Sequence, residues 1–204
     1  MLIGVIDYKA GNLRSVCNAL EYTKRATTTV VAKPSQLRKC DKLVLPGVGA
    51  FGQAMEHLRA AGFVDALQEE VLHRGKLFLG ICLGMQLVMS SSQEHGLHRG
   101  FDWVPGEVLP FKKVISQKVP HMGWNDITIR LRSPLVSDIS DHTDFYFLHS
   151  FYVKCREESH VLATCDYGMD FTAVLGKDNI FGVQFHPEKS QRYGVNLLMN
   201  FAVM

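Results

Sequence analysis

A cysteine between two glycines, where a predicted strand meets a predicted helix, constrains this sequence more than any other feature. The apolar run at residues 77–81 predicts a buried strand, and the turn Gly80-Ile81-Cys82-Leu83-Gly84 leads from it into a helical pattern. A strand, a thiol and a helix in this order are typical of a nucleophile elbow, in the cysteine version of the G-x-S-x-G turn. The free N–H groups at the start of a helix favour the reactive thiolate. The alternative is a buried cysteine that only packs.

A second apolar strand ends in His186-Pro187-Glu188, near the C-terminal end of the chain. A cysteine nucleophile needs a base, and histidine suits that task near neutral pH. Pro187 favours an extended conformation at His186, and in an extended segment residues i and i+2 point to the same side. Glu188 can therefore reach the His186 ring and fix its tautomer. A core histidine and a solvated glutamate are the alternatives for each residue alone, but together with Cys82 the catalytic interpretation is favoured.

Short apolar strands alternate with helical patterns in the first half of the sequence, and strands dominate the second half. The alternation predicts βαβ units and a parallel sheet. We therefore expect an α/β fold: a three-layer, flavodoxin-like, mostly parallel sheet flanked by helices, with a smaller antiparallel strand set. The active site should lie beyond the carboxyl ends of the strands. Strands are expected at residues 2–6, 29–31, 43–45, 77–81, 104–111, 127–130, 145–148, 161–164, 173–175 and 180–185, and helices at 13–24, 51–59, 63–72 and 191–203.

Length and composition exclude several classes of protein. The 204 residues fit one domain, spanning 1–204, and the net charge of +2 implies neither nucleic acid nor a membrane surface as a partner. Five cysteines, an odd number, favour a reducing cytoplasm over a disulfide framework. The N-terminus indicates a first strand rather than a signal peptide, and no apolar stretch is long enough to span a bilayer. His95 and His98 flank the end of an expected polar loop at 90–96 without a third ligand, so we expect no metal and no cofactor.

The residues around Cys82, His186 and Glu188 resemble the catalytic triad of class I, triad-type glutamine amidotransferases. The resemblance covers essentially the whole chain. It implies that glutamine is the substrate and that the Cys82 thiolate attacks its side-chain amide. It further implies that His186 protonates the departing ammonia and that water then hydrolyses the glutamyl thioester.

The same resemblance assigns residues around the triad. Pro46-Gly47-Val48-Gly49 follows a short apolar strand and matches the family's oxyanion strand, whose backbone N–H donors stabilise tetrahedral intermediates. For residues 46–49 the alternative is an ordinary Gly-rich loop; a phosphate loop is disfavoured because no Gly-Lys-Ser/Thr follows. For Gln86 and the segment around Ser150, the alternatives are ordinary helix polarity and strand-end capping. The expected oxyanion-hole residues are Val48, Gly49 and Leu83, and the expected substrate-binding residues are Gly47, Gln86, Ser150 and Phe151.

Three segments resemble one group within this family, the glutaminase subunits of imidazole glycerol phosphate synthases. These segments are Asp7–Leu13, Pro120–Asn125 and His186–Ser190. The resemblance implies a heterodimer with a (β/α)-barrel cyclase subunit, which uses the ammonia to close an imidazole ring in histidine biosynthesis. Lys9 departs from the pattern by adding a positive charge beside the expected docking surface. The expected partner-facing residues are Asn12, Trp124, Tyr146 and Lys189. Each has an alternative: Asn12 as a helix N-cap, and Trp124 as a core or hairpin aromatic. Tyr146 could be an ordinary strand aromatic and Lys189 a solvated charge.

Three other interpretations remain open. One is a paralogous amidotransferase that supplies ammonia to a related barrel synthase in another pathway, such as surface-sugar amidination. Another is a cysteine peptidase or related hydrolase on a similar fold, which would have an open cleft in place of a glutamine pocket. The third is a binding subunit without activity, although such a subunit has no need of Cys82, His186 and Glu188 together.

Overall fold

The computed structural model describes the backbone of residues 1–204 and every side chain except that of Lys113. Its centre is a five-stranded parallel sheet in the order β2-β1-β3-β4-β13. The chain runs outward from β1 to β2 and then returns to β3 on the other side of β1, so a topological switch point lies between the carboxyl ends of β1 and β3. The strands are β1 (Leu2–Ile6), β2 (Thr27–Val31), β3 (Lys42–Gly47), β4 (Phe78–Cys82) and β13 (Ile180–Val183).

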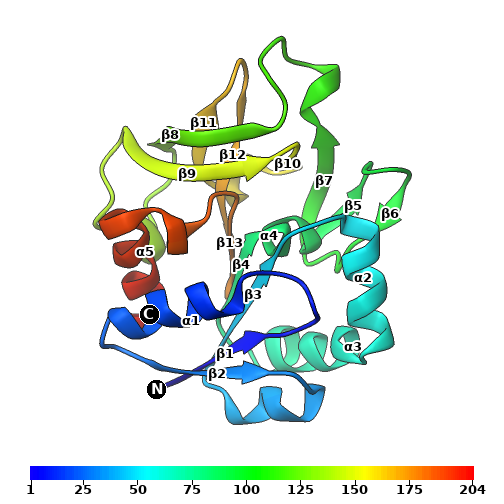
Figure 1. The fold of residues 1–204 in the computed structure, drawn as a ribbon, viewed down its shortest axis with the longest axis vertical. Coiled ribbons are helices and arrows are strands. Elements are labelled where there is room, and N and C mark those ends of the chain that lie inside the picture. Colours follow the sequence, from blue (N-terminus) through cyan, green and yellow to red (C-terminus); the bar gives the residue numbers. More distant parts are fainter.

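Helices cover both faces of this parallel sheet (Figure 1). Helices α1 (Leu13–Tyr22) and α5 (Gln191–Val203) pack on one face, and α2 (Phe51–Ala60) and α3 (Phe63–Gln68) pack on the other. On β3, alternate residues enter the two buried clusters: Val44 faces α1 and α5, while its neighbours face α2 and α3. Strands β3, β4 and β13 are buried along their whole length, as strands covered on both faces must be.

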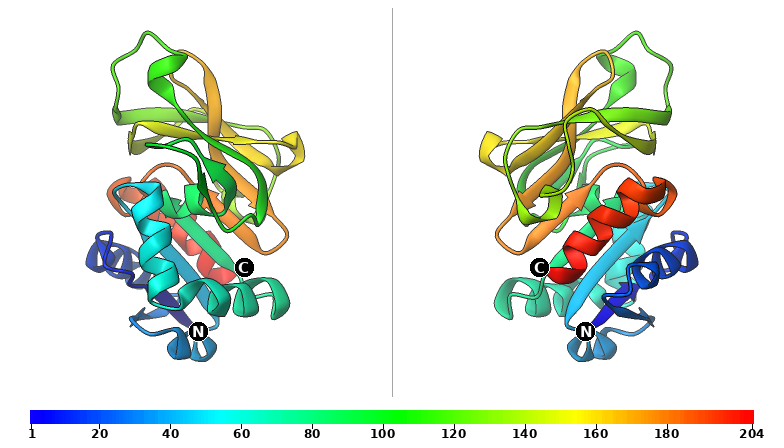
Figure 2. Two further views of the ribbon diagram at one scale, coloured as in Figure 1. Left: turned by 90° about the vertical axis from the view of Figure 1, so that its right-hand side faces the viewer. Right: turned by 90° about the vertical axis from the view of Figure 1, so that its left-hand side faces the viewer.

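Further strands, antiparallel to their neighbours except in the parallel pair of β5 and β7, extend the sheet beyond β13 and form the part of the molecule drawn above the parallel sheet in Figures 1 and 2. Strand β12 pairs with β13, and from β12 the path continues through β10, β7, β5 and β6. A second branch leads from β12 through β11 and β8 to β9. The expected combination of a parallel sheet, flanking helices and an antiparallel strand set is confirmed. The bounds are β5 (Met89–Ser92), β6 (His98–Arg99), β7 (Val104–Pro110), β8 (His121–Ile129), β9 (Thr143–His149), β10 (Phe151–Cys155), β11 (Val161–Asp166) and β12 (Asp170–Lys177).

Several local expectations were wrong. The polar loop expected at 90–96 begins as strand β5, because its backbone pairs with β7 although its three serines give no apolar signal. Strand β10 was not expected, since its buried residues do not alternate. The helix expected at 63–72 is α-helical only to Gln68 and continues as a π-helical turn over Glu69–His73. None of the described helices is long and apolar enough to cross a membrane.

Candidate active site

The turn around Cys82 has the geometry of a nucleophile elbow. Strand β4 ends at Cys82, whose backbone φ of 54° lies in the left-handed region that non-glycine residues rarely adopt. A Cβ atom at Gly84 would overlap the carbonyl oxygen of Leu45, so only glycine lets the chain after the elbow pack against β3. Helix α4 (Leu83–Leu87) follows and has only five residues, so its free N–H groups rather than a long helix dipole act on the sulfur.

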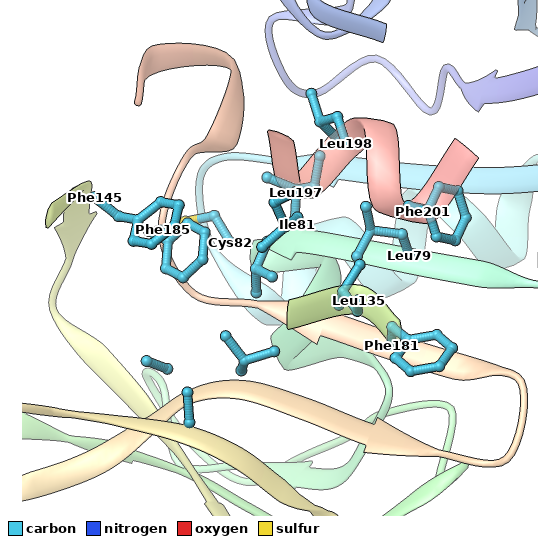
Figure 3. Close-up of a cluster of buried hydrophobic side chains, with 14 of the residues drawn as sticks. Leu79, Ile81, Cys82, Leu135, Phe145, Phe181, Phe185, Leu197, Leu198 and Phe201 are labelled. Atoms are coloured by element: carbon cyan, nitrogen blue, oxygen red, sulfur yellow. The ribbon is translucent and has the colours of Figure 1, made fainter. Parts of the chain in front are cut away.

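The sulfur lies at one end of the buried cluster that α5 forms with the sheet. Figure 3 shows Cys82 beside the rings of Phe185 and Phe145, at the opposite end of the cluster from Phe201. The rings of Phe145 and Phe185 are stacked, with their centroids 4.0 Å apart. Only 6% of Cys82 is exposed, so its surroundings are almost free of bulk water.

The structure brings His186 and Glu188 together as expected, but by a different local route. Nδ1 of His186 lies 2.9 Å from Oε1 of Glu188, and both side chains are almost completely buried. The expected extended segment ends at His186, because Pro187–Lys189 forms a 3-10 turn. The turn, rather than same-side alternation along a strand, carries the carboxylate back to the imidazole.

The protonation of His186 is set by two opposing influences. Burial lowers its pKa, but the Cys82 sulfur and the Glu188 carboxylate outweigh burial and raise the pKa to about 10. At neutral pH the ring is then an imidazolium. The Nε2 atom of His186 is buried and has no hydrogen-bond partner among the described residues, so its proton remains available to a reacting group.

The residues expected to bind substrate lie close to the elbow. Gly47 is paired with Cys82 in the register of β3 and β4, and a Cβ atom there would overlap the hydroxyl of Tyr8. The Nε2 atom of Gln86 donates to the carbonyl oxygen of Phe151 at 3.1 Å. Ser150 occupies the corner between β9 and β10, where its carbonyl oxygen accepts the N–H of Phe111.

The expected oxyanion-hole residues flank Cys82. Val48 and Gly49 follow directly after the residue that is paired with Cys82, and Gly49 has a φ of 98° that glycine adopts without strain. Leu83 is the first residue of α4 and is buried. A Cβ atom at Gly49 would meet nothing within 4 Å, so the backbone conformation rather than crowding favours glycine there.

The four residues expected to face a partner lie on one surface. The Trp124 and Tyr146 rings meet edge-to-face with centroids 6.0 Å apart, and Nζ of Lys189 lies 5.7 Å from the centre of the Tyr146 ring. Asn12 and Lys189 line a small cavity together with Val48, which connects this surface to the expected oxyanion strand. Asn12 is also the N-cap of α1, as its alternative interpretation required, and accepts the N–H of Ser15.

Comparison with known proteins identifies the family. The family profile described as "Glutamine amidotransferase class-I" matches residues 4–204. The "Imidazole glycerol phosphate synthase subunit HisH 1" of Campylobacter jejuni (strain 81-176) is 51% identical over 202 residues, which cover 98% of this chain and 99% of the relative.

The chain belongs to the class-I glutamine amidotransferases. A second relative of this amidotransferase is the "Imidazole glycerol phosphate synthase subunit HisH" of Geobacter sulfurreducens, 44% identical over 207 residues that cover 99% of this chain and 98% of the relative. Among solved structures, the "Structure of PurLQS from Thermotoga maritima" has a TM-score of 0.76 at 17% identity, covering 98% of this chain and 96% of that chain. That likeness concerns the fold alone.

The structure adds residues to the amidotransferase site that the sequence analysis did not select. Gln184 is fully buried, and its amide reaches the Cys82 sulfur. The available signal was its position two residues before His186, in the apolar run at 180–185 that was expected to be a strand. Glu94, in the expected polar loop, accepts the N–H of Phe51 at the start of α2, directly after the oxyanion strand. Among the described residues, no group of three or more His, Cys, Asp or Glu is arranged to hold a metal ion.

Two further buried histidines, His121 and His149, form a hydrogen-bonded pair behind the site. Nδ1 of His149 lies 2.8 Å from the carbonyl oxygen of Phe151, which can only accept, so this nitrogen carries a hydrogen. Nε2 of His149 must then accept from Nδ1 of His121, 3.1 Å away. Asn125 completes the chain at Nε2 of His121. Both rings are neutral in this arrangement.

We expect this neutral pair to make the amidotransferase sensitive to acid. Burial lowers the pKa of His121 to about 4, and burial, opposed by the bond to Phe151, lowers that of His149 to about 3. In the unfolded chain both titrate near pH 6.5, so below that pH the unfolded state binds more protons and the folded state loses stability. The free energy of unfolding should therefore fall by up to about 2.7 kcal/mol per pH unit between about pH 6 and 4 on account of the pair.

Urea unfolding at a series of pH values measures this dependence. His121→Gln removes one of the two protons and should make the loss shallower. The control is His142→Gln. Asp126 raises the pKa of this exposed histidine, so its protonation stabilises the folded state as the pH falls. Its replacement must not make the loss shallower, and an unchanged slope in His121→Gln would contradict the assignment.

Proposed function

We propose that this amidotransferase is the glutaminase subunit of an imidazole glycerol phosphate synthase. It hydrolyses glutamine to glutamate and ammonia and supplies the ammonia to a cyclase subunit in histidine biosynthesis. The observation that carries the proposal is the 51% identity to a subunit of that synthase, which extends over 98% of the chain. The buried Cys82, His186 and Glu188 provide the chemistry that such a subunit needs.

In the proposed reaction, the thiolate of Cys82 attacks the carbonyl carbon of the glutamine side chain. The resulting oxyanion is stabilised by backbone N–H groups of Val48 or Gly49 and of Leu83. His186 gives its Nε2 proton to the leaving nitrogen, the C–N bond breaks, and ammonia departs from a glutamyl thioester. His186, now neutral, takes a proton from water, whose oxygen attacks the thioester and releases glutamate. Glu188 accepts the Nδ1–H of His186 throughout and stabilises the imidazolium.

In the same proposal, Gly47, Gln86, Ser150 and Phe151 form the pocket for glutamine. The amide nitrogen of Gln86 donates its two hydrogens to Phe151 and Gln184. Gln86 therefore holds the wall of this pocket in place. The cytoplasm suits this function, because all five cysteines are free thiols.

The partner we propose is a (β/α)-barrel cyclase that docks on the surface formed by Asn12, Trp124, Tyr146 and Lys189. Trp124 is 49% exposed, and Met122, which points from the same strand, is 61% exposed. Large exposed side chains next to an aromatic neighbour and a lysine are typical of an interface centre. A partner here would lie against the oxyanion strand, because Val48 shares a cavity with Asn12 and Lys189.

We expect Trp124→Ala to weaken binding to the cyclase subunit of the same source by at least about 30-fold, because truncating an interface hot spot costs 2 kcal/mol or more. Isothermal titration calorimetry measures the effect. The matched control is Tyr22→Ala, which removes an aromatic side chain that is 74% exposed on α1. Equal losses in the two variants, or none in Trp124→Ala, would contradict the proposed docking surface.

The supply of ammonia is tested with glutamine labelled with ¹⁵N in its side-chain amide. The complete complex is given this glutamine, the cyclase substrate and excess unlabelled ammonium. If ammonia passes directly between subunits, the imidazole product keeps the ¹⁵N label. Product that carries mostly unlabelled nitrogen would show release into solvent, and absence of product with this cyclase would point to another barrel synthase.

A further inference from the structure

The side chain of Gln184 ends at the nucleophile, and the proposed reaction does not use it. Gln184 follows β13 and is completely buried. Its Nε2 atom lies 3.7 Å from Sγ of Cys82, within the range of a hydrogen bond to sulfur. Burying an amide costs free energy unless its polar atoms are hydrogen-bonded, so the partners of Gln184 matter for its role.

The orientation of the Gln184 amide follows from its neighbours. The carbonyl oxygen of Phe151 can only accept, so the atom of Gln86 that faces it at 3.1 Å is Nε2. The second hydrogen of the same nitrogen is donated to Oε1 of Gln184, also at 3.1 Å. With its oxygen held by Gln86, Gln184 presents its N–H₂ group to the sulfur. The amide is therefore a donor to Cys82.

The other polar neighbour of the sulfur acts in the opposite sense. The carbonyl oxygen of Leu148 lies 3.8 Å from Sγ and accepts the hydrogen of the neutral thiol. When that hydrogen leaves, Leu148 has nothing to accept, whereas Gln184 still donates and its bond becomes charge-assisted. The contact with Gln184 is thus stronger in the reactive thiolate than in the thiol.

We propose that Gln184 is a catalytic residue that donates a hydrogen bond to Sγ of Cys82 and stabilises its thiolate. Gln86 and the carbonyl group of Phe151 are positioning groups that hold the donor in place. This inference rests on the proposed role of Cys82 as the nucleophile of a glutaminase. It adds a fixed neutral donor to the charge supplied by His186, and it links the glutamine pocket to the nucleophile through three successive hydrogen bonds.

The test is the pH dependence of Cys82 alkylation by iodoacetamide in the complete chain. Peptide-resolved mass spectrometry separates Cys82 from the other four cysteines. In Gln184→Met, which keeps the volume and loses the donor, the pH of half-maximal reactivity should rise by about 1 to 2 units, the effect of one hydrogen bond to a charged group. Below that pH, alkylation should slow by about 10- to 100-fold.

Two further variants separate this effect from a loss of packing. Gln184→Asn keeps a buried amide that is too short to reach the sulfur, and it should shift the profile like Gln184→Met. Asn200→Leu is the matched control, because Asn200 lies on α5 and its buried amide donates to the carbonyl group of Leu135 rather than to the active site. It should lower the melting temperature and leave the alkylation profile unchanged.

Profiles of Gln184→Met and Gln184→Asn that superimpose on the wild-type profile would overturn the inference, even with a lowered melting temperature. Failure of the proposed function gives a different result. In that case glutamine would not protect Cys82 of the unmodified chain from alkylation, and Cys82 would react no faster than the half-buried Cys17.

Discussion

Cys82→Ala is expected to abolish glutamine-dependent synthesis by the complex and to leave ammonium-dependent synthesis within about twofold of the wild-type rate. The glutamine-dependent rate should fall by at least about 10⁴-fold, as for removal of other catalytic nucleophiles. Ammonia added as a salt bypasses the elbow, because the cyclase needs only the nitrogen. The two rates are measured on the same preparation by following the imidazole product.

The control for this variant is Cys165→Ala. Cys165 is as buried as Cys82, but it lies in β11 of the antiparallel part, where burial raises the pKa of its thiol. Its replacement removes a thiol from the core without touching the elbow, so both activities should persist. If Cys82→Ala also stopped ammonium-dependent synthesis, the division of labour between the two subunits would be wrong.

His186→Ala is expected to lower the rate of glutamine hydrolysis by about 10³- to 10⁴-fold, whereas Glu188→Gln should lower it less. Alanine removes the group that carries the proton in both half-reactions. Glutamine at 188 keeps an oxygen that can accept Nδ1–H and removes only the negative charge. Since that charge is one of the causes that raise the pKa of His186 to about 10, the pKa should fall in Glu188→Gln.

The loss of charge in Glu188→Gln should also change how glutaminase activity depends on pH. In the wild-type protein the imidazolium persists until the pH approaches 10, so the alkaline limb of glutaminase activity lies at high pH. In Glu188→Gln the imidazolium is lost at lower pH, and the alkaline limb should move down. The control is Glu157→Gln, an exposed carboxylate 3.9 Å from His160, which should leave the profile unchanged. A larger loss in Glu188→Gln than in His186→Ala would reverse the assigned roles.

The sequence predicted the parallel part of the fold well, because most of its strands are short apolar runs bounded by turn residues. Strand β2 begins with three threonines, and only residues 29–31 of it were expected. Strand β1 and helix α5 begin and end at the expected residues. The elbow was predictable because Gly80 and Gly84 mark a close approach of two backbones, which a side chain would obstruct. Strand β5 was not predictable, since its pairing with β7 is a property of the sheet and not of its serines.

The contacts around the site depended on pairing that no local pattern reveals. His121 and His149 meet because β8 and β9 pair in a register that places them opposite each other. Glu188 reaches His186 through a turn that was expected to be extended. Gln184 lies two residues before His186 in the run expected as a strand, but β13 ends at Val183, so the contact of Gln184 with Cys82 also depends on a bend in the chain.

The measurement that tests the central claim most directly is glutamate release from glutamine by the purified chain. It is made with the chain alone, with the cyclase subunit of the same source, and with that cyclase loaded with its substrate. We expect slow release alone and strong stimulation by the loaded cyclase, both lost in Cys82→Ala. A chain that releases glutamate equally fast without the cyclase, or that keeps its activity in Cys82→Ala, would contradict the account.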